Sequence, residues 1–187
     1  MALFVQASTF MHQYIYSRMH STPAKTPDAL KLGVISSAQI NAAGSKLSDR
    51  SYSDGYGSIL ITAVIHPTES HPSVILYAIA SRDLATAQKA QKQYSFTKAY
   101  GSYAALVDDP DIDIVYVSVP NALHYEWASK ALKAGKHVLC EKPFTSNADE
   151  AKRLVQLAKE RGLIVEEAVC LLCPRGRDRL LMTLVHW

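Results

Sequence analysis

From Lys31 onward, short apolar runs rich in β-branched residues alternate with segments of helical periodicity. Buried parallel strands read as nearly continuous apolar runs, and their alternation with helices is typical of a parallel sheet covered on both faces. The sequence therefore predicts an α/β fold built on a doubly wound parallel sheet. We expect strands over residues 32–36, 74–80, 96–100, 112–119, 137–140 and 163–165.

Helix caps stand between these runs. Asp83 can begin a helix that runs to about residue 94, and Asn147 with Glu150 has the character of a capping box. Gly135 and Gly162 follow the last turns of two helices, where the left-handed conformation favours glycine. We therefore expect helices over residues 83–94, 103–107 and 122–134, and a further helix that ends at Gly162.

Two segments depart from this alternation. Residues 44–62 are rich in Gly, Ser and Asp and stand where the first crossover helix should continue, although such clusters favour turns. Residues 169–187 show neither strand alternation nor a capped helix. We expect a flexible lead over residues 1–30, one folded domain over residues 31–168 with an insert at 44–62, and an irregular tail.

Length and composition fit one globular domain. At 187 residues, 48% hydrophobic and 20% charged, the chain can bury a single core. Its net charge of +3 includes no Lys/Arg run, and no apolar stretch approaches the roughly 18 residues of a spanning helix, so we predict neither a nucleic-acid nor a membrane partner. The sparse cysteines favour the cytoplasm. A mitochondrial presequence stays an alternative, because residues 1–25 lack acidic residues.

Polar segments follow four of the predicted strands. In a doubly wound sheet the ligand binds outside the carboxyl ends of the strands. Loops are polar in any protein, but four such segments in register favour a binding edge. The segments contain Ser36, Ser37 and Ala38 after the first strand, Ser81 and Arg82 after the second, Pro120, Asn121 and His124 after the fourth, and Glu141 and Lys142 after the fifth.

The first two turns bear on a dinucleotide cofactor. Of the G-x-G-x-x-G motif, residues 36–41 keep only the small side chains at positions 36 and 38, which an ordinary strand-to-helix turn also explains. At the second turn, Arg82 can bind the 2′-phosphate of NADP and Ser81 can add a hydroxyl donor. A solvated surface arginine beside a capping Asp83 is the alternative. The pattern favours NADP over NAD.

Lys142 is the candidate catalytic residue. A lysine at a strand end beside a cofactor can donate a hydrogen bond or a proton to a substrate oxygen and stabilise the charge that develops as hydride moves. The following proline fixes the local backbone. A surface ion pair between Glu141 and Lys142 is the alternative that these residues leave open.

Two motifs resemble those of a known family. Residues 117–124 and 134–144 are similar to the P-N-x-x-H and A-G-K-H-V-x-x-E-K-P pattern of the Gfo/Idh/MocA oxidoreductases, in particular the branch of NADP-dependent D-xylose 1-dehydrogenases and dimeric dihydrodiol dehydrogenases. The resemblance implies a Rossmann fold over residues 31–168. It implies that Lys142 is catalytic or orients the substrate, and that Asn121 and His124 line the cofactor crevice.

The resemblance also implies a function. It is that of an oxidoreductase, using NADP rather than NAD, that transfers hydride between the nicotinamide and a sugar or trans-dihydrodiol. The partner is then a small molecule, and full-length relatives of this kind pair as homodimers through a second, α+β domain. No metal is predicted, because Cys170 and Cys173 lack a second pair of ligands.

The chain departs from the family at two places. Residues 166–168 resemble an E-A element that leads into the second domain in the family, whereas the residues from 169 onward differ. We expect that domain to be missing, we hypothesise that residues 44–62 and 169–187 are translated introns, and we predict little dehydrogenase activity. A non-catalytic nucleotide-binding or interaction module and an unstable pseudogene product are the alternatives.

Overall fold

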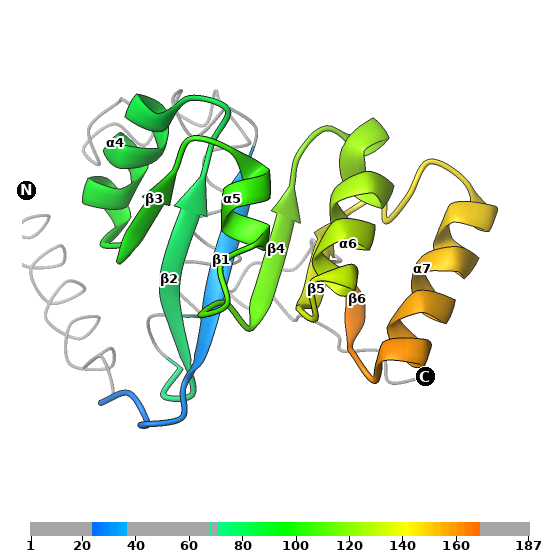
Figure 1. Cartoon of the computed structure of the whole chain (residues 1–187), viewed down its shortest axis with the longest axis horizontal. Helices are drawn as coiled ribbons and strands as arrows, with labels where there is room; N and C mark the ends of the chain where they lie inside the picture. Colours follow the sequence, from blue (N-terminus) through cyan, green and yellow to red (C-terminus); the bar gives the residue numbers. More distant parts are fainter. Residues whose placement is uncertain (1–23, 37–67, 69–70, 169–187) are drawn as a thin grey trace, which may run out of the picture.

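A computed structural model of the protein describes residues 24–36, 68 and 71–168 (Figure 1). These residues form a sheet of six parallel strands in the order β3-β2-β1-β4-β5-β6. The strand order reverses at β1, so the prediction of an α/β fold with a doubly wound parallel sheet is confirmed. The strands are β1 (Leu30–Ser36), β2 (Val74–Ala80), β3 (Lys98–Tyr100), β4 (Ile114–Ser118), β5 (His137–Glu141) and β6 (Val165–Ala168).

Two helices begin, and two end, at predicted capping residues. The Asp83 side chain accepts a hydrogen bond from the Thr86 amide, and the Asn147 side chain accepts one from the Glu150 amide. Gly135 and Gly162 have positive φ angles of 80° and 64°, as the glycine position after a helix requires. The helices are α4 (Leu84–Tyr94), α5 (Tyr103–Val107), the short 3-10 helix η3 (Asn121–Leu123), α6 (His124–Lys133) and α7 (Ala148–Arg161).

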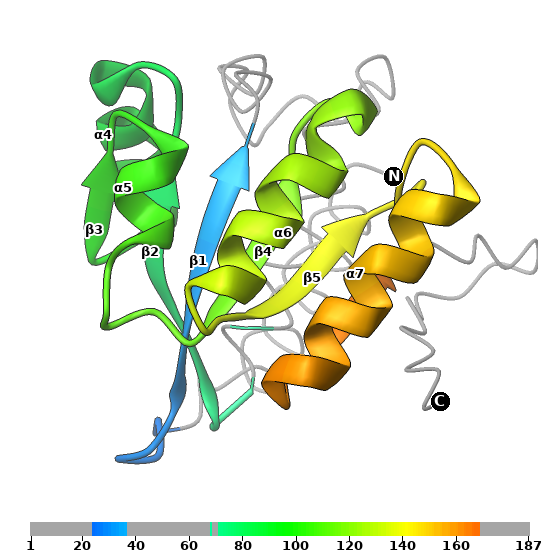
Figure 2. The ribbon, with the colours of Figure 1, turned by 45° about the vertical axis from the view of Figure 1, so that its right-hand side comes forward.

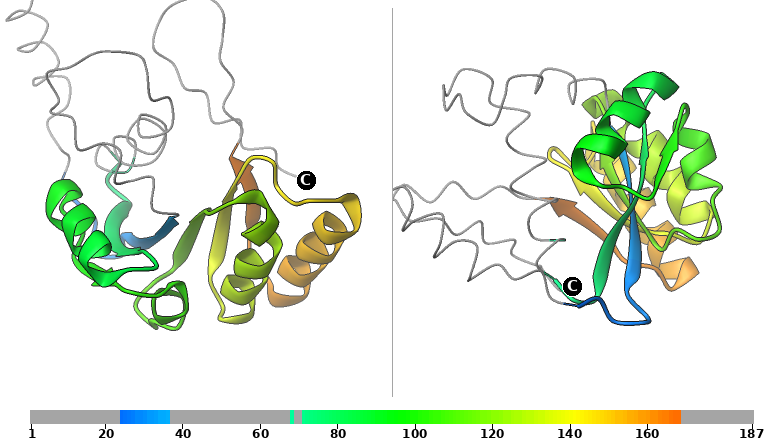
Figure 3. Two further views of the ribbon diagram at one scale, coloured as in Figure 1. Left: turned by 90° about the horizontal axis from the view of Figure 1, so that it is seen from above. Right: turned by 90° about the vertical axis from the view of Figure 1, so that its left-hand side faces the viewer.

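Each face of the sheet has its own apolar cluster. Helices α5, α6 and α7 bury one face, where Ile35, Val117 and Leu132 are fully buried. Figures 2 and 3 show α6 and α7 side by side over this face. Helix α4 packs against the other face through Ala90, in a cluster with Val34. Because helices cover both faces, the sheet lies at the centre of the domain. The polar residues that follow the strands lie at its edges.

Several strand boundaries differ from the prediction by two or three residues. Strand β3 starts at Lys98, because Phe96 closes the end of α4 through its amide, which donates to the Gln91 carbonyl. Strand β6 starts at Val165, since pairing with β5 begins there opposite Val138. In both cases residues predicted as strand complete a helix end or a turn instead. The predicted insert at 44–62, the tail at 169–187 and residues 1–23 of the lead lie outside the described residues.

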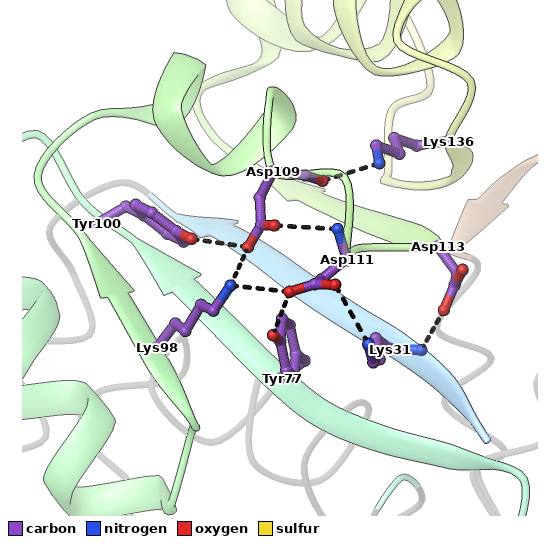
Figure 4. Close-up of polar contacts among 8 residues, drawn as sticks. All are labelled: Lys31, Tyr77, Lys98, Tyr100, Asp109, Asp111, Asp113 and Lys136. Atoms are coloured by element: carbon purple, nitrogen blue, oxygen red, sulfur yellow. Dashed lines mark hydrogen bonds and ion pairs between the residues drawn. The ribbon is translucent and has the colours of Figure 1, made fainter. Parts of the chain in front are cut away.

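A network of ion pairs and hydrogen bonds joins β1, β2 and β3 with the loops before β4 and β5 (Figure 4). The loop before β4 supplies the carboxylates. Lys98 contacts Asp109 at 3.0 Å and Asp111 at 3.1 Å, and Lys136 donates to the Asp109 carbonyl at 2.8 Å. The Lys31 amide donates to Asp113 at 2.7 Å. The network therefore fixes the sheet at the edge opposite the predicted site.

Candidate functional site

The carboxyl ends of the strands share one edge of the sheet. All neighbouring strands are parallel, and Ser36 at the end of β1 pairs with Ser118 at the end of β4. Ser81 directly follows β2, and Glu141 ends β5. The described ends of β1, β2, β4 and β5 therefore lie at one edge of the sheet, and the binding role of each residue stays a prediction.

A buried tyrosine holds the end of β1. The Tyr103 hydroxyl donates to the Ser36 carbonyl at 2.7 Å, and the Tyr103 ring packs edge-on against Trp127 with centroids 5.2 Å apart. Helices α5 and α6 thereby fix the point at which the chain leaves the sheet. Ser37 and Ala38, which complete the predicted turn, lie outside the described residues.

The end of β2 holds a buried hydroxyl without a partner. Ser81 is 4% exposed, and its Oγ is one of two buried side-chain atoms of the described residues that have no hydrogen bond, the other being Thr26 Oγ1. Arg82 beside it is exposed and makes no ion pair with a described residue. The Asp83 carboxylate is engaged, because Oδ2 accepts from both the amide and the hydroxyl of Thr86 at 2.9 Å. The available groups here are thus a hydroxyl and a guanidinium.

The end of β4 is joined to the loop after β5 by His124. The imidazole is 1% exposed, with Nε2 2.8 Å from the Val119 carbonyl oxygen and Nδ1 2.8 Å from the Pro143 carbonyl oxygen. Both ring nitrogens are therefore occupied by the backbone. Pro120 and Asn121, by contrast, are exposed at the start of η3. The geometry gives His124 a role in holding the crevice and leaves Asn121 accessible to a ligand.

The carboxylate of Glu141 is held from two sides. The Tyr116 hydroxyl donates to Oε1, and the Lys142 amide donates to Oε2 at 3.1 Å. An ion pair between Glu141 and Lys142, the alternative interpretation of this sequence, is not among the ion pairs of the described residues. Glu141 thus orients the backbone at Lys142 and leaves the ammonium group unengaged.

Two contacts fix the rest of this loop. The Phe144 amide donates to Glu167 of β6 at 2.8 Å, and Cys140 Sγ lies 3.6 Å from the Phe144 carbonyl oxygen. The Lys142 side chain is exposed and makes no hydrogen bond or ion pair with a described residue. A loop held by residues of β4, α6 and β6 therefore presents, at the carboxyl edge, an ammonium group that no described residue engages.

Burial shifts two pKa values beside Lys142. Burial, followed by the hydrogen bond to the Glu141 carboxylate, raises the pKa of Tyr116 far above that of an ordinary phenol, and a hydrogen bond with Ser118 opposes the shift. Burial, with the Glu141 and Glu167 charges, raises the pKa of Cys140 to about 12. Tyr116 therefore stays a hydrogen-bond donor at neutral pH, and Cys140 stays an unreactive thiol.

Sequence analysis did not identify Tyr103, Tyr116 or Glu167 as part of this site. A hydroxyl in the middle of an apolar strand, as at Tyr116, signals a buried partner. The identity of that partner depends on which strands are neighbours, and a run of apolar residues does not encode this. The described residues contain no cluster of three or more metal-ligating side chains and no helix with the length and apolar character for a membrane crossing.

Comparison with known proteins identifies a family. Residues 55–169 match the Gfo/Idh/MocA family, described as an oxidoreductase family with an NAD-binding Rossmann fold. The match includes β2 to β6 and three of the four predicted binding segments. The chain spans about a third of the length of the curated relatives it matches.

Two curated relatives and one crystal structure illustrate the similarity. D-xylose 1-dehydrogenase (NADP(+)) 2 of Haloferax volcanii is 44% identical over 91 residues, 49% of this chain and 28% of the relative. Trans-1,2-dihydrobenzene-1,2-diol dehydrogenase of Bos taurus is 41% identical over 103 residues, 55% of this chain and 30% of the relative. The 3-ketoreductase KijD10 of Actinomadura kijaniata, in complex with NADP and TDP-benzene, superimposes with a TM-score of 0.60 at 34% identity, over 74% of this chain and 37% of KijD10.

Proposed function

Because the chain belongs to the Gfo/Idh/MocA family of NAD(P)-dependent oxidoreductases, we propose that it supplies the NADP-binding part of an enzyme that transfers hydride between the nicotinamide and a sugar or trans-dihydrodiol. The observation that carries the proposal is the polar edge at the carboxyl ends of β1, β2, β4 and β5. In a doubly wound sheet, dinucleotides bind across this edge where the strand order reverses. Here the order reverses at β1, which lies between β2, followed by Ser81, and the pair of β4 and β5, where β5 ends at Glu141.

The end of β2 fits NADP better than NAD. NAD sites of this fold use a carboxylate at this place to bind the ribose hydroxyls. The Asp83 carboxylate caps α4 instead, whereas among the described residues the buried Ser81 hydroxyl has no hydrogen-bond partner and the Arg82 guanidinium has no ion-pair partner. A phosphate would accept hydrogen bonds from both groups. The relatives from Haloferax volcanii and Actinomadura kijaniata, which are described with NADP, support this preference.

Lys142 is the residue proposed to act on the substrate. The bound nicotinamide would supply the hydride chemistry. The Lys142 ammonium, at the end of a loop fixed through Glu141 and Phe144, would donate a hydrogen bond to the substrate oxygen and stabilise its developing charge. A sugar or diol offers such an oxygen, as the names of the relatives from Haloferax volcanii and Bos taurus indicate for those enzymes.

Replacing Arg82 tests the cofactor assignment. Arg82→Ala removes a charge-assisted hydrogen bond to the 2′-phosphate, so NADPH should bind weaker by about 2 kcal/mol, or roughly thirtyfold in Kd. NADH, which lacks this phosphate, should bind equally well to both proteins. Titration followed by NADPH fluorescence measures the change. Arg153→Ala, which removes an arginine from α7, is the matched control and should leave both affinities unchanged. An equal loss in both arginine variants would contradict the assignment.

A non-catalytic nucleotide-binding module is the second candidate function, because a Rossmann domain can bind its cofactor without chemistry. An assay of NADP reduction with D-xylose and with a trans-dihydrodiol separates the two functions. We expect NADPH binding together with little turnover, since the chain spans about a third of the length of its relatives. Turnover at the rates of those relatives would overturn the expectation of low activity and exclude the module.

A further inference from the structure

We infer that Tyr116 is a positioning residue for Lys142, acting through the carboxylate of Glu141. The catalytic meaning of this inference rests on the proposed function of Lys142. The positioning itself is argued from the contacts of β4, β5 and the loop that follows β5.

Tyr116 lies in the middle of β4 and reaches the end of the neighbouring strand. It pairs with Leu139 of β5, so Glu141 is two residues further along on the same face of the sheet. Such diagonal neighbours lie within reach of long aromatic side chains. At 1% exposure the Tyr116 hydroxyl must find its hydrogen-bond partner within the protein, and Glu141 Oε1 accepts this bond.

The second carboxylate oxygen of Glu141 connects Tyr116 with the backbone of Lys142. Oε2 accepts the Lys142 amide at 3.1 Å, so one carboxylate connects a buried strand hydroxyl with the backbone of the exposed lysine. Because burial keeps Tyr116 protonated, its hydroxyl remains a donor across the neutral range. The backbone from which the Lys142 side chain extends is therefore held from inside the sheet.

Removing the Tyr116 hydroxyl should release this arrangement. In Tyr116→Phe the ring still fills the core, but Glu141 loses the donor that holds Oε1, and the carboxylate can rotate away from the Lys142 amide. A small displacement of a catalytic group can cost a large factor in rate. The first measurable consequence is lower protection of the Lys142 amide, whose acceptor is the Glu141 side chain.

Amide hydrogen exchange followed by NMR tests the inference on the full chain. In Tyr116→Phe, exchange at Lys142 should rise by about tenfold, while the amides of β5 should change less than about twofold. Tyr77→Phe is the matched control, because its hydroxyl donates to Asp111 at the opposite edge. Glu141→Gln, which keeps the side-chain shape at a half-buried site, should reproduce the change at Lys142. Unchanged exchange at Lys142, or equal acceleration throughout β4 and β5, would overturn the inference.

Cofactor binding supplies a second readout that a purely structural role would not move. Since the loop that carries Lys142 lies at the edge proposed to bind the nicotinamide half, NADPH should bind Tyr116→Phe about tenfold weaker, while 2′,5′-ADP, which lacks that half, should bind within about twofold of the wild type. Equal weakening of both ligands contradicts a role at Lys142. If the wild type fails to bind NADPH, the proposed function is wrong, and the exchange result at Lys142 still decides whether Tyr116 positions this loop.

Discussion

Ser81 has a buried hydroxyl that no described residue of the protein satisfies. The side chain is 4% exposed, and its Oγ has no hydrogen-bond partner, whereas its amide donates to the Tyr100 carbonyl at 3.1 Å. Leaving such a group unpaired costs about 1–3 kcal/mol. A phosphate or ribose oxygen at this place would offset the cost. Under the proposed function, the Ser81 hydroxyl therefore lowers the stability of the free protein and contributes to cofactor affinity.

Replacing Ser81 by alanine should separate these two effects. Ser81→Ala removes the unpaired hydroxyl, so the free energy of unfolding should stay constant or rise by up to about 1 kcal/mol, while NADPH affinity falls by roughly fivefold. Urea denaturation and NADPH titration measure the two quantities. Ser102→Ala is the control, because the Ser102 hydroxyl accepts the Ala105 amide and its loss should cost about 1 kcal/mol. Similar destabilisation in both variants would contradict the interpretation.

At the scale of elements, the first turn of α6 connects two loops of the site. His124 places its ring nitrogens against the carbonyls of Val119 and Pro143, one from each loop. A tight connection here keeps Asn121 and Lys142 at a constant separation. The connection depends on one imidazole, which contacts both carbonyl oxygens at 2.8 Å.

His124→Asn should destabilise the domain more than an exposed histidine change does. The substitution removes both contacts of a buried imidazole with the backbone, so we expect a loss of about 2 kcal/mol or more in the free energy of unfolding, measured by urea denaturation. His137→Asn serves as the comparison, because His137 is half-buried and its Nδ1 accepts one amide, that of Ile164. Equal losses at the two positions would argue against the connecting role of His124.

The elements themselves were largely predictable from the sequence. Apolar runs and capping residues such as Asp83, Asn147 and Gly162 are local signals, and each acts as predicted. The ends of β3 and β6 were not predictable, because strand ends depend on pairing. Val165 joins the sheet through Val138, which is distant in sequence.

The residues of the candidate site that belong to a family motif were predictable from the sequence. Lys142 and Asn121 belong to motifs with a family pattern, and parallel strands place them at one edge. The support beneath them was not predictable, because the contacts of Tyr116 with Glu141 and of Tyr103 with Ser36 join residues 25 and 67 positions apart. His124 was expected to line the crevice, and its burial followed from the fold rather than the motif.

At the scale of the molecule, the two edges of the sheet differ in how their polar groups are satisfied. At the amino edge, Lys98, Asp109 and Asp111 contact one another within a closed network (Figure 4). At the carboxyl edge, the Ser81 hydroxyl and the Arg82 and Lys142 side chains make no such contacts with described residues. This difference fits the proposal that the amino edge stabilises the fold and the carboxyl edge binds the cofactor.

The amino-edge network should make stability depend on acidic pH. The Tyr77 hydroxyl and the Lys98 ammonium lower the pKa of Asp111 from 3.8 to about 2. A carboxylate with a lowered pKa stabilises the folded state above its unfolded pKa, and this contribution is lost as the pH falls toward the folded value. Urea midpoints should therefore fall between about pH 4 and pH 2.

Substitutions at Asp111 and Asp108 test the source of this acid dependence. Asp111→Asn should flatten the fall of the urea midpoint, because the asparagine has no carboxylate to protonate. Asp108→Asn changes an exposed neighbour whose side chain is outside the network, so it should keep the wild-type slope. An unchanged slope in Asp111→Asn would contradict the role of the network.

The central claim is that the carboxyl edge of this sheet binds a phosphorylated dinucleotide. Isothermal titration calorimetry of the 187-residue chain with NADPH and with NADH tests it most directly. We predict a Kd for NADPH at least about tenfold lower than that for NADH, since the Arg82 side chain and the Ser81 hydroxyl are proposed to bind the 2′-phosphate. Absence of NADPH binding, or equal affinity for the two cofactors, would contradict the account.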